Sequence, residues 1–209
     1  MIRLCRVAPD VRTLGPGVRF CVWVQGCPRR CPGCMSPETQ PLDGGEWIDE
    51  ETLVARMRPF DFEGLTISGG EPMLQSPGLL RLILLLRAER DAGVILYTGY
   101  TLEELKSKGD PDVLALLGQV DALIDGPYIQ ALDDDGALRG SSNQRIHFFT
   151  DRYRALEAAF GVPGAREQQM QIDDQGVLII GLRKHSRSGP AHTEGAKDET
   201  GEGQQTAGL

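Results

Sequence analysis

Three cysteines within eight positions most constrain what this 209-residue chain can fold into. Cys27, Cys31 and Cys34 have the spacing C-x3-C-x2-C and follow an apolar segment, 18–25 (VRFCVWVQ), which Gly26 closes. That segment is rich in β-branched and aromatic residues, so we expect it to be a core strand. The total of five cysteines is odd, and their clustering favours metal ligation over a disulfide framework. The fold must therefore place this loop where a metal site can work.

The number of cysteines in the loop limits the kind of metal site. Thiolates are the ligands of iron–sulfur clusters, and three of them leave one iron of a four-iron cluster open, as a catalytic site requires. A zinc knuckle is the alternative, but no histidine lies near the loop to complete it. Cys5 or Cys21 could serve as a fourth ligand, although the alternation around Cys21 favours a core position. A non-catalytic iron–sulfur or zinc protein stays open at this point.

Strands and helices alternate after the loop. Helix signals include a capping residue, Asp49, and a serine followed by proline at positions 76 and 77. The patterns predict strands at 64–68, 94–98 and 120–125, and helices at 50–58, 76–93, 101–107 and 111–117. This order indicates an α/β fold in which helices pack on a parallel sheet.

The C-terminal third is more polar. A long loop, 126–145, is predicted to be functional because structureless loops of that length are uncommon. A strand at 146–149 and a helix at 153–160 follow, and the stretches 170–172 and 177–180 flank a turn and predict a β-hairpin. We expect residues 1–184 to form one domain and the polar residues 185–209 to be a disordered tail.

Charge and hydropathy exclude some partners. The net charge of −8 leaves no broad basic field for nucleic acid. The longest apolar run, 79–86, contains Arg81 and is far shorter than the roughly 20 residues that span a bilayer. The first residues lack the apolar region of a secretory signal, so we expect a cytoplasmic protein that binds neither nucleic acid nor membrane.

A second motif, SGGEP at 68–72, follows the predicted strand 64–68. Glycines let the backbone approach a ligand closely, and α/β folds place their sites at the carboxyl ends of strands. Alone, the motif could be an ordinary strand-to-loop turn. In the same chain as the cysteine loop, it predicts a ligand-binding turn.

The segment GPGVRFCVWVQGCPRRCPGC, 15–34, resembles the entry segment of the radical S-adenosylmethionine (SAM) activating enzymes, and SGGEP resembles their SAM-binding turn. Three further segments look like those of anaerobic ribonucleoside-triphosphate reductase activating proteins: TGYTLEEL at 98–105, ALIDGPYIQAL at 122–132 and RGSSNQ at 139–144. The resemblance covers about 14–149. The chain departs from it by extending further at the C-terminus and by a Met-Ser-Pro-Glu sequence that resembles activases of other glycyl-radical enzymes.

The resemblance implies a fold and a set of site residues. The fold would be a partial (β/α) barrel of the radical SAM type, open on one side, with a C-terminal hairpin. A 4Fe-4S cluster would be held near the carboxyl ends of the strands. The resemblance assigns the cluster to Cys27, Cys31 and Cys34, and SAM to Gly33, Cys34, Met35, Gly70 and Glu71. Thr98 and Asp125 end predicted strands and either face the site or serve as a cap and a turn former.

The resemblance also implies an activity, that of a radical SAM oxidoreductase. A flavodoxin or ferredoxin-type reductant would reduce the cluster, and SAM would be cleaved to methionine and a 5′-deoxyadenosyl radical. That radical would take a hydrogen atom from a glycine of an anaerobic ribonucleotide reductase, leaving a glycyl radical. The alternative within the same chemistry is a radical SAM enzyme that acts on another glycyl-radical enzyme, a small molecule or a peptide.

Overall fold

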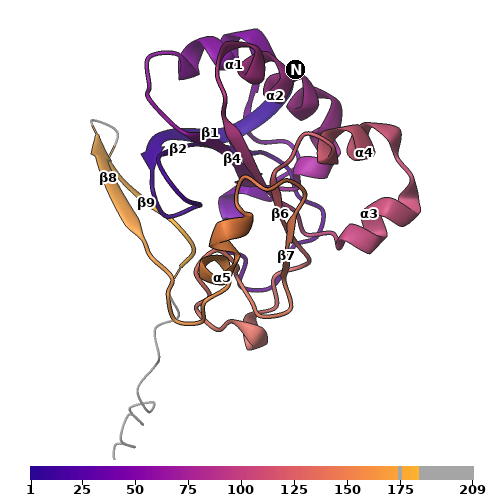
Figure 1. Cartoon of the computed structure of the whole chain (residues 1–209), viewed down its shortest axis with the longest axis vertical. Helices are drawn as coiled ribbons and strands as arrows, with labels where there is room; N and C mark the ends of the chain where they lie inside the picture. The colour runs from indigo at the N-terminus through magenta and orange to yellow at the C-terminus, as the bar shows by residue number, and fades with distance from the viewer. Residues whose placement is uncertain (174–175, 184–209) are drawn as a thin grey trace, which may run out of the picture.

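A computed structural model of the chain describes residues 1–173 and 176–183 (Figure 1). The strands are β1 (Ile2–Val11), β2 (Arg19–Val24), β3 (Glu46–Ile48), β4 (Gly64–Gly69), β5 (Gly93–Tyr97), β6 (Ala122–Asp125), β7 (Arg145–Phe148), β8 (Gln169–Asp173) and β9 (Gly176–Ile180). The α-helices are α1 (Glu50–Met57), α2 (Ser76–Glu89), α3 (Leu102–Lys108), α4 (Pro111–Leu117) and α5 (Glu157–Phe160). Short 3-10 turns cover Pro37–Thr39, Pro72–Gln75, Gln130–Leu132 and Arg154–Leu156.

Seven strands form one sheet in the order β3-β1-β2-β4-β5-β6-β7. The four central strands, β2, β4, β5 and β6, are parallel, whereas β1, β3 and β7 pair antiparallel at the edges. The α/β prediction is therefore confirmed, with a sheet that is mostly but not wholly parallel. The sheet does not close on itself, so a barrel is not established.

Two strands on one side of the sheet, β1 and β3, were not predicted. β1 contains Pro9 and Asp10, and two irregularities in its pairing with β2 break the alternation that would reveal a strand. β3 has only three residues, and Trp47 in its middle is exposed. Neither pattern carries enough periodic signal to be recognised from the sequence.

Helices cover one face of the sheet. Side chains alternate between the two faces of a strand, so that in β2 the residues Phe20, Val22 and Val24 pack with the helices while Cys21 and Trp23 face the other way. Residues of α1, α2, α3 and α4 complete this core, which includes Leu53, Leu82, Leu105 and Leu116. Asp49 accepts a hydrogen bond from the Thr52 N–H and caps α1, as predicted.

C-terminal segments cover the opposite face. Tyr153 and Phe160 pack on Ile95 and Ile124, and Ile180 of β9 packs on the β2 side of the same face. The predicted hairpin is confirmed as β8–β9, which lies at one side of the molecule, away from α1–α4 (Figure 1). The helix predicted at 153–160 is a 3-10 turn followed by the short α5.

The extent of the domain stays a prediction. The hairpin turn at 174–175 and the tail expected at 185–209 lie outside the described residues. Within the ranges that the structure describes, no helix combines the length and the apolar character needed to cross a membrane.

Candidate functional site

One pocket gathers the two sequence motifs at the carboxyl edge of the parallel strands. Its cavity volume is about 160 Å³. The loops that follow β2, β4, β5 and β6 all contribute to its wall, as expected for the site of an α/β sheet. The lining residues from the two motifs are Cys27, Cys31, Cys34, Met35, Ser68, Gly69, Gly70 and Glu71.

The cysteine loop is fixed to the body of the protein through its backbone. The Gly26 N–H donates to the Thr39 carbonyl at 2.8 Å, and the Cys27 N–H donates to the Gln40 carbonyl at 3.0 Å. A 3.2 Å bond from the Cys34 N–H to the Cys31 carbonyl closes a turn inside the loop. All three thiols are half-buried and free of disulfides. Burial raises the pKa of Cys27, so a bound cation would be needed to favour its thiolate.

The glycine turn after β4 packs directly against this loop. The Gly70 N–H donates to the Val24 carbonyl at 2.8 Å, and the Glu71 N–H donates to the Gly26 carbonyl at 2.9 Å. A Cβ on Gly70 would lie 2.3 Å from the Gly26 carbonyl oxygen, so no larger residue fits without a shift of the backbone. Gly69 has a φ of 102°, which also favours glycine. The two motifs therefore form one structural unit.

Glu71 lies beneath the pocket wall, with no exposed surface. Its carboxylate accepts hydrogen bonds from the Thr98 hydroxyl at 2.7 Å, the Gly99 N–H at 2.9 Å and the Met73 N–H at 3.1 Å. Burial nevertheless raises its pKa. The side chain thus ties the end of β4 to the end of β5, and most of its acceptor capacity is used within the protein.

The other predicted residues divide into two groups. Met35 and Thr98 line the pocket. Gly33 is absent from its lining and adopts a φ of 70° beside the Gln130 side chain. Asp125 lies on the helix-covered face and accepts hydrogen bonds from the Leu102 N–H at the start of α3 and from His147. The expectation that Asp125 faces the site is thus not met, whereas its alternative role as a local structural residue fits these bonds.

Several pocket residues were missed by sequence reasoning. Trp23 and Tyr97 could have been found from strand alternation. It places both on the face of the sheet opposite the helices, the inner face. Arg6 of β1 and Arg29 of the cysteine loop also contribute. Residues 179–182, at the end of β9 and just after it, form one side of the pocket. No local sequence signal could have placed them there.

Two of the four buried polar side-chain atoms without a partner in the described residues belong to side chains that line this pocket. The Tyr97 hydroxyl and Nε of Arg6 are buried and have no hydrogen-bond partner among the described residues. Buried polar groups in native proteins are almost always paired, so each such exception requires an explanation. Both residues line the same pocket as the three loop cysteines, and a polar ligand bound there would supply the partners.

The donor set fits an iron–sulfur cluster better than a single ion. In the part of the chain that is described, no three Cys, His, Asp or Glu side chains are grouped tightly enough to hold one metal ion. The three loop cysteines instead share a pocket, as the ligands of a group larger than one ion would. Cys21 is buried in the core, where burial raises its pKa to about 12, so it behaves as the packed cysteine predicted from the sequence.

Comparisons with known proteins bear on the same residues. The sequence profile of the family described as a 4Fe-4S single cluster domain matches residues 13–147. The anaerobic ribonucleoside-triphosphate reductase-activating protein of Vibrio cholerae is 38% identical over 145 residues, which are 65% of this chain and 91% of that relative. The chain belongs to this family of activating proteins.

Two further relatives match, one over most of its length and one over half of it. The activating protein of the same name from Escherichia coli is 32% identical over 142 residues, 64% of this chain and 90% of that relative. The pyruvate formate-lyase-activating enzyme of Clostridium pasteurianum is 33% identical over 131 residues, 58% of this chain and 50% of that relative. Membership of the activating-protein family confirms the resemblance seen in the sequence and gives the chain an iron–sulfur cofactor.

Proposed function

We propose that this chain is a radical SAM activase that generates a glycyl radical on an anaerobic ribonucleoside-triphosphate reductase. The observation that carries the proposal is the joining of the cysteine loop and the glycine turn in one pocket, where the Glu71 N–H binds the Gly26 carbonyl. Relatives that carry this activity in their names support it. The open sheet with helices on one face is consistent with a partial (β/α) barrel of the radical SAM type.

Cys27, Cys31 and Cys34 would hold a 4Fe-4S cluster at the mouth of the pocket. When both groups are bound, the cluster supplies one electron and SAM supplies the carbon radical that takes a hydrogen atom from a glycine of the partner. The chain itself contributes three thiolates and leaves one iron free of protein ligands. A flavodoxin or ferredoxin-type protein is the proposed electron donor.

The glycine turn and the loop backbone would hold the amino-acid end of SAM. Gly70 and Glu71 are the proposed residues on one side, and Gly33, Cys34 and Met35 are the proposed residues on the other. The carboxylate of Glu71 already accepts three hydrogen bonds, so its main contribution is to fix the turn and the end of β5 around the ligand. Thr98, which lines the pocket and donates to Glu71, belongs to the same support.

The apolar part of the pocket would exclude water from the reacting atoms. Its apolar lining includes Leu14 and Trp23, which pack with Ile180 of β9, and Leu182 of the C-terminal chain. Tyr97 also lines this pocket, and its buried hydroxyl has no hydrogen-bond partner among the described residues.

Anaerobic reconstitution with iron and sulfide, followed by dithionite and SAM, tests the proposal. We expect 5′-deoxyadenosine by chromatography and, after mixing with the reductase, the electron paramagnetic resonance doublet of a glycyl radical on the reductase. Stoichiometric zinc without iron or sulfide in anaerobically purified protein would contradict the assignment. Formation of deoxyadenosine without a glycyl radical on the reductase would retain the SAM chemistry and reject this partner.

A second candidate partner is pyruvate formate-lyase, which the match to its activating enzyme favours. The chain spans half the length of that relative, whereas it spans 90% or more of the two reductase activators. The reductase is therefore the first choice. Parallel mixing experiments with the two glycyl-radical enzymes distinguish them, because only the true partner acquires the radical signal.

A further inference from the structure

The β8–β9 hairpin has two faces of different character. Gln169, Gln171, Leu178 and Ile180 face the body of the protein, whereas the alternate residues point outward. The outward residues are all apolar, and their exposed fractions are 61% for Met170, 74% for Ile172, 61% for Val177 and 56% for Ile179. Met170 pairs with Ile179 and Ile172 with Val177 across the two strands, so the four side chains form one continuous apolar face.

The hairpin is held firmly against the domain. The side-chain amides of Gln169 and Gln171 each donate at 2.7 Å, to the carbonyls of Asp10 and Pro9 respectively. Ile180 is buried with residues of β1 and β2, on the inner face of the sheet. These contacts fix the position of the outward apolar face relative to the rest of the domain.

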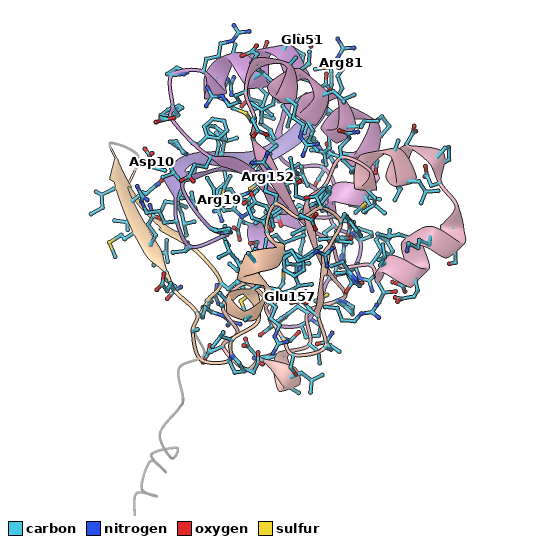
Figure 2. All side chains as sticks on the ribbon, viewed as in Figure 1. Asp10, Arg19, Glu51, Arg81, Arg152 and Glu157 are labelled. Atoms are coloured by element: carbon cyan, nitrogen blue, oxygen red, sulfur yellow. The ribbon has the colours of Figure 1, made fainter. Side chains whose placement is uncertain are left out.

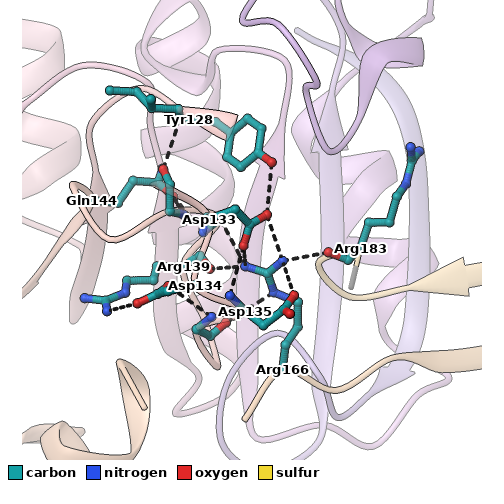
Figure 3. Close-up of polar contacts among 12 residues, drawn as sticks. Tyr128, Asp133, Asp134, Asp135, Arg139, Gln144, Arg166 and Arg183 are labelled. Carbon is teal, nitrogen blue, oxygen red and sulfur yellow. Dashed lines mark hydrogen bonds and ion pairs between the residues drawn. The ribbon is translucent and has the colours of Figure 1, made fainter. Parts of the chain in front are cut away.

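A buried arginine fixes the chain on both sides of the hairpin. Arg166, which precedes β8, is fully buried and forms an ion pair with Asp133 at 2.9 Å (Figure 3). Its guanidinium also donates to the carbonyl of Arg183, which follows β9, at 2.6 Å, and to the carbonyl of Arg139 at 2.8 Å. The same group thus joins both ends of the hairpin to the loop between β6 and β7.

The apolar face leads directly into the pocket. Ile179 belongs both to the outward face and to the pocket lining, and Ile180, Gly181 and Leu182 continue that lining. The rest of the lining comes from the cysteine loop, the glycine turn and residues such as Tyr128 and Gln144 of the loop between β6 and β7. The end of the hairpin is therefore one wall of the pocket, and its outward face borders the pocket at Ile179.

The hairpin lies outside the part of the chain that the family shares. The matched family profile ends at residue 147, and the matches to the reductase activators cover 64–65% of this chain but 90–91% of the relatives. The hairpin is therefore an addition to a domain that already contains the cysteine loop and the glycine turn. Because this addition forms one wall of the pocket, we expect it to affect which substrate reaches the pocket.

We propose that the outward face of the β8–β9 hairpin is a docking surface for the glycine-bearing protein that this chain activates, which reaches the pocket along Ile179. The inference rests on the proposed function, because only a protein substrate needs such a surface beside the pocket. Exposed apolar patches of this kind mark protein interaction sites in soluble proteins. The complementary surface on the partner would be an apolar segment next to the glycine.

A double substitution at the far end of the hairpin, Ile172→Thr with Val177→Thr, tests the proposal. Neither residue lines the pocket, and threonine keeps the β-branched shape that suits a strand. The cluster-loaded chain and its variants would be titrated anaerobically against immobilised anaerobic ribonucleoside-triphosphate reductase. We expect the Kd of the variant to rise about tenfold or more, while deoxyadenosine formation with dithionite and no partner stays unchanged.

A matched control replaces two exposed leucines on the other face of the molecule, Leu84→Gln with Leu114→Gln. This variant should bind the reductase as the wild type does. An unchanged Kd in the hairpin variant, with a wild type that binds and activates the reductase, would overturn the docking surface alone. A wild type that cleaves SAM but does not bind the reductase would overturn the proposed function as well.

Two other occupants of the apolar face are separate outcomes. A wild-type dimer that the Ile172→Thr/Val177→Thr variant dissociates, seen by light scattering, would assign the face to a second copy and reject the proposal. Hairpin-dependent sedimentation with phosphatidylcholine and phosphatidylglycerol vesicles would assign it to a membrane and also reject the proposal.

Discussion

The two faces of the main sheet are built from the same strands but carry different chemistry. The helix-covered face carries mostly apolar side chains, such as Val22 and Leu65, together with the buried carboxylate of Asp125 at the end of β6. The inner face, one residue out of phase, carries the buried polar side chains of Arg19, Thr66 and Tyr97 among its apolar residues. Buried polar groups are thus concentrated on the inner face, where Tyr97 lines the pocket, whereas the helix-covered face mainly supplies apolar packing.

Arg19 shows how the inner face tolerates a buried charge. Its Nε donates to the Thr66 hydroxyl at 2.5 Å, and its two terminal nitrogens donate to the Tyr153 hydroxyl at 2.8 Å and the Leu65 carbonyl at 2.7 Å. Arg19 has no exposed surface, whereas Glu51 and Arg81, labelled in Figure 2, form an ion pair on the outside, over α1 and α2. Arg19 lies at the opposite end of β2 from the cysteine loop, so its network supports the inner face rather than the site.

The largest effect should come from the cysteine loop. We expect Cys31→Ala to lose the cluster and all SAM cleavage, because two thiolates cannot hold a four-iron cluster that needs three. Iron and sulfide content and the absorbance near 400 nm after reconstitution would measure the loss. A Cys31→Ala protein that keeps an active cluster would reject the ligand assignment.

Cys21→Ala is the matched control, since Cys21 is on the inner face of β2 but in the core. This substitution should keep the cluster and cost about 1 kcal/mol of unfolding free energy through lost packing. Loss of the cluster in the Cys21→Ala control would show that Cys21 is needed for cluster binding and is not only a core residue.

The next largest effect should follow removal of Arg166. Arg166→Met removes a fully buried guanidinium that pairs with Asp133 and donates to the carbonyls of Arg139 and Arg183, and breaking a buried pair of this kind typically costs about 3–5 kcal/mol. Because Arg166 joins the hairpin ends, we expect the cost as local opening: faster amide hydrogen exchange across 166–183, with α2 unaffected. Arg154→Met, which removes an exposed ion pair with Asp151, should change exchange little.

On the helix-covered face, Leu82→Ala should cost about 2–5 kcal/mol of unfolding free energy, measured by urea denaturation. Leu82 is fully buried and remote from the pocket lining, so the folded variant should bind the cluster and SAM normally. A specific loss of SAM affinity in the folded variant would break the division between the two faces.

Sequence reasoning recovered the parts of the fold that local patterns encode. The central strands and helices α1–α4 have clear periodicity and caps, such as Asp49 and Thr101, and were predicted within a few residues. β1 was missed because bulges break its alternation, and β7 was not recognised as antiparallel because strand direction depends on where the long loop 126–144 leads. Tertiary packing, rather than local propensity, decides both.

The site was recovered to the extent that its motifs are contiguous. The cysteine loop and SGGEP were found, and the structure brings them together through Gly26 and Glu71. The role of the glycines was predicted only in part. They were expected to let the backbone approach a ligand closely, whereas the close neighbour of Gly70 is the Gly26 backbone. The hairpin wall depends on Arg166 and Ile180, whose contacts lie far away in the sequence, so no local pattern could reveal it.

The smallest expected effect tests a single atom on the inner face. Tyr97→Phe removes a buried hydroxyl that has no partner among the described residues. If SAM fills the pocket as proposed, its acceptor atoms would pair with this hydroxyl, and the variant should bind SAM about threefold to tenfold more weakly in calorimetry. The matched control is Tyr100→Phe. Tyr100 lies three residues further along the chain, packs against the helix-covered core and is outside the pocket lining, so this variant should bind SAM normally.

The stability of the SAM-free protein separates this role from a structural one. A hydroxyl that stabilised the fold through its own hydrogen bond would lower the melting temperature when removed. An unpaired buried hydroxyl costs desolvation free energy, so Tyr97→Phe should melt at the same temperature as the wild type or higher. A lower melting temperature with unchanged SAM affinity would make Tyr97 a core residue. The part of the inner face that binds the ligand would then lie nearer the cysteine loop.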